Sequence, residues 1–240
     1  MKFKVRKLAT LMAPILAISI SSPVFAGMGD DPLLTKVMID QFEKRYSDGG
    51  EDPLILEADA WIGKDLHKAW FKFDAEQVNG KLEEFEVQAL YSRAVDPYWD
   101  FQIGWKHNSK PKPDSDWLAL GFKGLAPYWC EVDAAAFIGE SGQVNLSLAA
   151  EYELMLTQQW VLSPEAEVNF YTKDDDSREI GSGLSDSQLG LRLRYEIKRE
   201  FAPYIGVNWT RKYGGTADHA HNEGEDTNDV QFVAGIRAWF

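Results

Sequence analysis

The stretch SQLGLRLRYE (residues 187–196) alternates between two kinds of side chain. Leucine and tyrosine occupy one face of the extended chain, and glutamine, arginine and glutamate occupy the other. The stretch EEFEVQALY (residues 83–91) repeats this pattern. An alternation of period two over nine or ten residues is typical of a β-strand and not of a helix. Such stretches recur between turn residues, and no convincing amphipathic helix follows residue 26. The sequence therefore predicts an all-β protein.

The alternating stretches favour a membrane barrel over a soluble sandwich. They are about 9–11 residues long, enough to cross a bilayer when tilted, whereas sandwich strands are more often about five or six. Their polar faces carry full charges in mid-strand. The two longest connections, 173–184 and 213–229, are placed outside the cell, and the short turns face the periplasm. An even strand number then requires a weakly alternating first strand at 35–46.

The expected fold is an antiparallel, up-and-down transmembrane β-barrel of about 12 strands, closed so that every strand edge is paired. The predicted strands lie near residues 35–46, 54–63, 68–77, 83–93, 98–108, 115–123, 128–139, 143–154, 160–172, 185–197, 201–212 and 230–240.

The N-terminus has the features of a signal peptide. Four basic residues precede the apolar segment 8–20, and Ala26 supplies a small residue for cleavage. We expect a signal peptide at 1–26, a short tail at 27–33 and a barrel at 34–240, located in the outer membrane of a Gram-negative bacterium. No later stretch approaches the ~20 apolar residues of a membrane-spanning helix. The chain's net charge of −13 argues against a nucleic-acid partner.

Aromatic residues mark the predicted membrane interfaces. Tyr98, Tyr128 and Tyr204 each follow a proline at the start of an outward strand. Tyr and Trp are enriched at such interfaces, although packing in a core is the alternative. The last nine residues, FVAGIRAWF, alternate up to Phe240. This ending resembles the C-terminal signal by which outer-membrane barrels are recognised for assembly.

The inward faces of the strands after the first predict an acidic lumen, with 14 acidic against seven basic side chains. Two functions remain open for this lumen: it attracts cations by focusing the field, or its charges form a salt-bridged plug that only stabilises the barrel. Neighbouring strands bring four carboxylates to a similar depth, where a cation could balance them. The candidate cation-binding residues of the lumen are Glu131, Asp133, Glu151, Glu153, Glu57 and Asp59.

A second candidate metal site lies in the last long loop, at Asp218, His219 and His221. Imidazole is a suitable ligand for Cu(II) and zinc. A solvated acidic loop is the alternative, because long barrel loops are commonly mobile and polar. Cys130 falls on the lipid face and is expected to act as a small hydrophobic residue.

No catalytic site is expected. A lipid hydrolase needs Ser, His and an orienting acid together at the lipid boundary. Ser92, Ser147 and Ser163 have no His on a compatible strand face, and no G-x-S-x-G, H-E-x-x-H or phosphate-loop motif occurs.

An ordered set of strings links the chain to a known family. They include LYSRA (90–94), GLAPYW (124–129), GLRLRYE (190–196), REFAPY (199–204) and AGIRAWF (234–240). Over roughly residues 34–240 the sequence resembles the copper resistance protein B family of bacterial outer-membrane barrels. The resemblance implies a role in copper tolerance, with copper as the bound or transported ion and periplasmic copper-handling proteins as partners. It leaves open the direction of transport and the oxidation state of copper.

One departure from the family concerns the N-terminal tail. Members commonly carry a Met- and His-rich stretch there, but residues 27–34 contain one Met and no His.

The expected function is copper binding or passage through the acidic lumen. The alternatives are a structural barrel or narrow cation pore without copper selectivity and, third, an outer-membrane enzyme.

Overall fold

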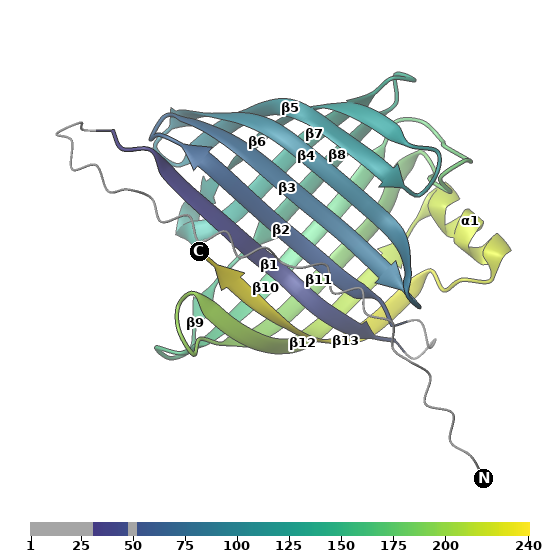
Figure 1. The fold of residues 1–240 in the computed structure, drawn as a ribbon. Coiled ribbons are helices and arrows are strands. Elements are labelled where there is room, and N and C mark those ends of the chain that lie inside the picture. Colours follow the sequence, from purple (N-terminus) through teal and green to yellow (C-terminus); the bar gives the residue numbers. More distant parts are fainter. Residues whose placement is uncertain (1–30, 48–51) are drawn as a thin grey trace, which may run out of the picture. The chain divides into compact units, whose positions relative to one another are not determined.

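The computed structural model describes residues 31–47 and 52–240, which form a β-barrel with one helix at its rim (Figure 1). The predicted signal peptide and most of the predicted tail lie outside the described residues. The strands are β1 (Leu34–Tyr46), β2 (Leu54–Gly63), β3 (His67–Val78), β4 (Lys81–Asp96), β5 (Trp99–Lys110), β6 (Ser115–Ala126), β7 (Cys130–Gly139), β8 (Val144–Glu151), β9 (Leu154–Met155), β10 (Trp160–Tyr171), β11 (Gly183–Tyr195), β12 (Phe201–Lys212) and β13 (Asn228–Trp239).

Apart from β8 and β9, which both pair with β10, each strand pairs antiparallel with its neighbours in the chain, and β13 pairs with β1 to close the barrel. β8 and β9 keep one register against β10 and together form a single strand. The interruption between them faces Pro164, which has no N–H to donate to the ladder. The wall therefore has twelve strands within the described residues. This confirms the predicted all-β, up-and-down barrel and its strand number.

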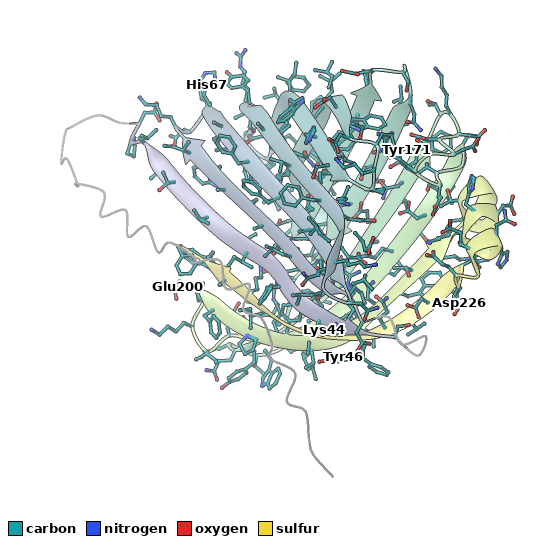
Figure 2. The ribbon with its side chains drawn as sticks, turned by 45° about the vertical axis from the view of Figure 1, so that its right-hand side comes forward. Lys44, Tyr46, His67, Tyr171, Glu200 and Asp226 are labelled. Carbon is teal, nitrogen blue, oxygen red and sulfur yellow. The ribbon has the colours of Figure 1, made fainter. Side chains whose placement is uncertain are left out.

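The two ends of the barrel differ in their connections. One end carries the connections after β1, β3, β5, β7, β10 and β12, including the two longest, and we name it the loop end. The other, with both ends of the described barrel chain, is the turn end. In Figure 2, Asp226 at the loop end and Glu200 at the turn end lie at opposite ends of the wall.

The distribution of polar and apolar side chains is the reverse of that in a water-soluble protein. Large apolar residues are exposed on the outer face, among them Phe71, Trp105 and Leu148. Polar residues inside, such as Ser92 and Asn208, are fully buried. An apolar band facing outward around a polar interior is the arrangement that a transmembrane barrel requires. No helix among the described residues is long and apolar enough to span a membrane.

The C-terminal residue closes the seam between the first and last strands. The Phe240 N–H donates to Val37 O at 2.9 Å, and the Val37 N–H donates to Phe240 O at 3.0 Å.

Deleting Phe240 removes both hydrogen bonds at the point where the wall closes. We expect the deletion to lower strongly the fraction of protein that migrates as a folded, heat-modifiable band from outer membranes. Phe240→Tyr, which keeps the backbone, is the control; equal folded fractions for deletion and wild type would contradict this role.

Two sequence expectations are wrong in detail. Tyr204 does not lie at a membrane interface: it points into the lumen, is 5% exposed, and donates to Glu43. The last long connection, expected to be a loop, also contains a helix, α1 (Gly214–Glu223), which is not strongly amphipathic. Only Ala220 of α1 is buried. The Thr216 hydroxyl accepts a hydrogen bond from the Gly181 N–H of the preceding loop and shares another with Ser185 of β11, and these contacts hold the helix in place. Tertiary contacts therefore stabilise α1 in the absence of a strong apolar stripe.

Tyr98 and Tyr128 do lie exposed at the turn end. Tyr98 packs edge-to-face against Trp129, with ring centroids 6.2 Å apart. The segment Pro127–Trp129 forms a single 3₁₀ turn in place of the first residues of the predicted strand.

Candidate functional site

The lumen contains a cavity of about 270 Å³ whose lining is strongly acidic. Three basic side chains, Lys72, Lys123 and Arg237, line it together with three times as many carboxylates. These carboxylates are Asp40, Glu57, Asp59, Asp74, Glu131, Asp133, Glu151, Glu165 and Glu167. Of the six lumen residues predicted from the sequence, five therefore line one cavity, and Glu153 lies beside it in contact with Arg237.

Strand register sets carboxylates side by side in two rows. In the first row, Asp74 on β3 lies opposite Glu57 on β2 and opposite Glu86 on β4. In the second, Glu151 on β8 lies opposite Glu131 on β7 and opposite Glu165 on β10. Directly opposed residues have Cβ atoms about 4.5–5.5 Å apart. Each row therefore concentrates negative charge, because like charges at this spacing repel unless a cation balances them.

Basic side chains balance some of these carboxylates. Lys72 reaches across the lumen to Asp133, at 2.6 Å. Arg237 contacts Asp40 at 2.9 Å, Glu153 at 2.8 Å and Glu151 at 3.6 Å. Arg194 also contacts Glu151 and Glu153.

The four carboxylates of β7 and β8 are therefore not equivalent. Asp133, Glu151 and Glu153 are ion-paired, whereas no basic side chain of the described chain lies within ion-pair distance of Glu131. The same holds for Glu57, Asp59 and Asp74.

A buried ionic network fills the side of the lumen near β1 and β10–β12. Glu43, only 1% exposed, accepts hydrogen bonds from Arg192 at 2.8 and 2.9 Å, from Arg45 at 2.7 Å and from Tyr204 at 2.9 Å. Arg192 also pairs with Glu165. A side chain at Gly190 would collide with both partners of that pair. The network is completed by Gln41, which accepts from Arg192 at 2.8 Å.

Sequence reasoning missed this network because the first strand changes face. The register of β1 shifts by one residue between Ile39 and Gln41 against β2, and between Ile39 and Phe42 against β13. A β-bulge inserts one residue and so reverses the alternation beyond it. Asp40 at the bulge, and Glu43 and Arg45 after it, can therefore all face the lumen. The weak alternation of residues 35–46 was the signal of this bulge.

The predicted loop site has a different geometry from the one expected. Asp218, His219 and His221 all lie on α1, and residues one or two apart on a helix do not face each other. His219 Nε2 lies 3.6 Å from Asp176 in the preceding loop, whereas His221 and Asp218 are exposed. The structure thus does not bring the two histidines together. Within residues 31–47 and 52–240, no three His, Cys, Asp or Glu side chains are arranged to hold a metal ion.

The loop between β10 and β11 is anchored to its surroundings. Arg178 donates to Pro113 O at 2.6 Å and Asp114 O at 3.1 Å, and pairs with Asp175 at 2.6 Å. A hydrogen bond with Glu223 of α1 raises the pKa of Glu179. Contacts with two neighbouring loops therefore order this acidic loop.

Comparison with known proteins places this acidic barrel in a family. The family profile of the copper resistance protein B precursor matches residues 33–240, which span the whole barrel. The chain belongs to the copper resistance protein B family. It is 45% identical to copper resistance protein B of Escherichia coli over 85% of this chain and 69% of the relative. It is 43% identical to the copper resistance protein B homolog of Pseudomonas syringae pv. tomato (strain ATCC BAA-871 / DC3000), over 88% and 71%.

Among solved structures, the NanC porin resembles the barrel with a TM-score of 0.57 and 11% identity, covering 85% of this chain and 99% of the porin. This likeness shows the fold alone. The family match and the barrel fold both confirm the resemblance seen in the sequence. The two relatives named above are a copper resistance protein B and a homolog of it.

Proposed function

We propose that this member of the copper resistance protein B family resides in the outer membrane after cleavage near Ala26 and binds or passes copper ions through its acidic lumen. The observation that carries the proposal is the cavity lining, in which carboxylates outnumber basic side chains by three to one. A cavity lined by one sign of charge and enclosed by low-dielectric walls raises the local concentration of the opposite ion. Copper is the substrate here, and no catalytic role is proposed.

Strand register also places acidic residues at several depths along the barrel. Glu76 and Glu84 are opposite each other near the loop end, and Asp74 and Glu57 follow toward the middle. Glu131 extends the acidic lining to the turn end. A cation that moved from one member to the next would remain near a negative charge over the length of the lumen. Passage requires several binding sites of this kind, each weak enough to release the ion.

One observation favours a second candidate, a narrow cation pore without copper selectivity. Carboxylate oxygens are the ligands that harder ions such as Mg²⁺ and Mn²⁺ prefer, and carboxylates dominate the lining. Flux into liposomes that contain the refolded barrel separates the two functions, with copper, zinc and magnesium supplied in turn. Copper-selective flux supports the first candidate, and equal flux of all three ions supports the second. No flux of any ion above protein-free liposomes would exclude passage and leave copper binding or a structural barrel.

We also propose that the histidines of α1 bind Cu(II) at the surface of the barrel. Because His219 and His221 lie on different sides of α1, each should bind Cu(II) independently. We expect His219→Ala and His221→Ala each to remove a separate part of the loop's Cu(II) binding, and the double variant to remove the sum. Equilibrium dialysis at fixed pH measures this. Full loss in either single variant would indicate a chelate, and unchanged binding in the double variant would assign no metal role to α1.

Periplasmic copper-handling proteins are the partners that we propose for the turn end. Co-purification of the barrel with such a protein from copper-treated cells tests this proposal. If the periplasmic protein co-purified equally well with a barrel whose turn-end connections were altered, the result would count against this proposal.

A further inference from the structure

One sulfur atom faces the acidic cavity. Met38 of β1 lines the cavity. Among the described residues that line it, no other carries a sulfur atom. The Met38 Sδ lies 4.0 Å from Arg237 Nη2, in the geometry of an acceptor for that guanidinium N–H. The sulfur of Met38 therefore contacts the charged guanidinium of Arg237, and the side chain is not packed solely as a hydrophobic residue.

The surroundings of Met38 are rich in carboxylates. Asp59 on β2 lies directly opposite Met38, and Asp40 lies two residues further along β1 on the same inner face. The positive charge of Arg237 is balanced by Asp40 at 2.9 Å and Glu153 at 2.8 Å. A cation at the thioether would therefore meet a local environment that is negative overall, because Asp59 and Glu131 have no ion-pair partner among the described residues.

Thioether and carboxylate ligands differ in the ions they prefer. A soft thioether favours Cu(I), whereas carboxylates favour harder ions. We propose that Met38 is the residue that makes the cavity selective for monovalent copper over hard divalent cations, by adding one soft ligand to the carboxylates of β1 and β2. This inference rests on the proposed function, since it names the ligand that would distinguish copper from other cations in the same lumen.

The chain offers a matched control. Met155 of β9 is 67% exposed, outside the cavity. Met38→Leu and Met155→Leu make the same chemical change, the loss of a sulfur with a nearly constant volume, at two positions that differ in access to the lumen. Both are made in a Cys130→Ala background, because the thiol of Cys130 would otherwise bind soft metal ions by itself. Folding of each variant is verified by heat-modifiable migration on a detergent gel.

The probe is Ag(I), which shares the ligand preferences of Cu(I) without its redox chemistry, and binding is measured by equilibrium dialysis of the refolded barrel. We expect Met38→Leu to weaken Ag(I) binding about tenfold, the effect of about 1.4 kcal/mol of lost ligand energy, and to leave Mn(II) binding unchanged. Met155→Leu should bind Ag(I) like the parent. Met38→Cys should restore or strengthen Ag(I) binding.

Equal Ag(I) affinities for Met38→Leu and the parent would overturn the proposal, as would an equal loss in Met155→Leu. If Met38→Leu failed to fold, Met38→Cys would decide: a thiol that bound Ag(I) no more tightly than Met38 would refute soft coordination there. These measurements concern equilibrium binding and need no transport. Failure of the proposed function would appear separately, as copper flux that does not depend on the lumen carboxylates.

Discussion

Replacing Arg192 by Met is expected to destabilise the barrel by about 3–5 kcal/mol, the usual cost of removing one partner from a buried ion pair. The guanidinium of Arg192 is 4% exposed and joins Glu43 to Glu165 and Gln41. Without it, Glu43 would keep Arg45 and Tyr204, but Glu165 would lose its ion-pair partner inside the lumen. The measurement is equilibrium unfolding in denaturant, followed by tryptophan fluorescence of the barrel in lipid vesicles.

Arg93→Met is the matched control, because Arg93 is exposed on the outer face of β4 near the turn end. This substitution should change the free energy of unfolding by less than about 0.5 kcal/mol. The double variant Arg192→Met/Glu165→Gln should lose less stability than the sum of its single variants, because it removes the charge that Arg192→Met leaves unbalanced. Strict additivity in this cycle, or a stable Arg192→Met, would show that the network does not hold the wall together.

Neutralising the unpaired lumen carboxylates is expected to lower copper flux by about tenfold or more, within the range in which charged clefts alter the rates of ion entry. The triple variant Glu57→Gln/Asp74→Asn/Glu131→Gln removes three negative charges and keeps the shape of the cavity. None of these residues has a basic partner within ion-pair distance among the described residues. Flux is measured with a copper-sensitive dye inside liposomes that carry the refolded protein.

The control triple variant, Glu140→Gln/Glu200→Gln/Asp226→Asn, makes the same change in net charge in connections outside the cavity lining. It should conduct copper like the wild type. The wild-type flux should also fall as ionic strength rises, because salt screens the field of the lumen. Equal flux through both triple variants, with both shown to be folded, would place any copper path away from these carboxylates.

This design differs from the one that the sequence favours. The four carboxylates of β7 and β8 are the obvious targets from their spacing alone. In the structure, however, Asp133 pairs with Lys72, and Glu153 pairs with Arg194 and Arg237. Neutralising Asp133 would leave Lys72 without its partner, and neutralising Glu153 would remove one ion pair from each of two arginines, so stability would fall together with flux. Only Glu131 of the four can be neutralised without breaking an ion pair.

The strand pattern, the closed barrel and its twelve strands could be predicted from the sequence, because alternation of period two is a local consequence of extended backbone geometry. Every strand crosses the same lipid solvent, so each must present an apolar outer face, as in SQLGLRLRYE. The acidic character of the lumen also follows from this alternation. The helix α1 could not be predicted in the same way, because contacts of Thr216 with distant residues stabilise it more than its own weak apolar pattern.

The balance of charges inside the lumen was decided only by the tertiary structure. Glu43 and Arg192 are 149 positions apart and meet because the barrel closes and because β1 contains a bulge. Alternation determines which face a side chain occupies, but not which residue across the lumen lies within reach of it. Ion pairing falls off steeply with distance and depends on strand register and barrel closure. The same register places Met38 opposite Asp59, and no local pattern in the sequence predicts this pairing.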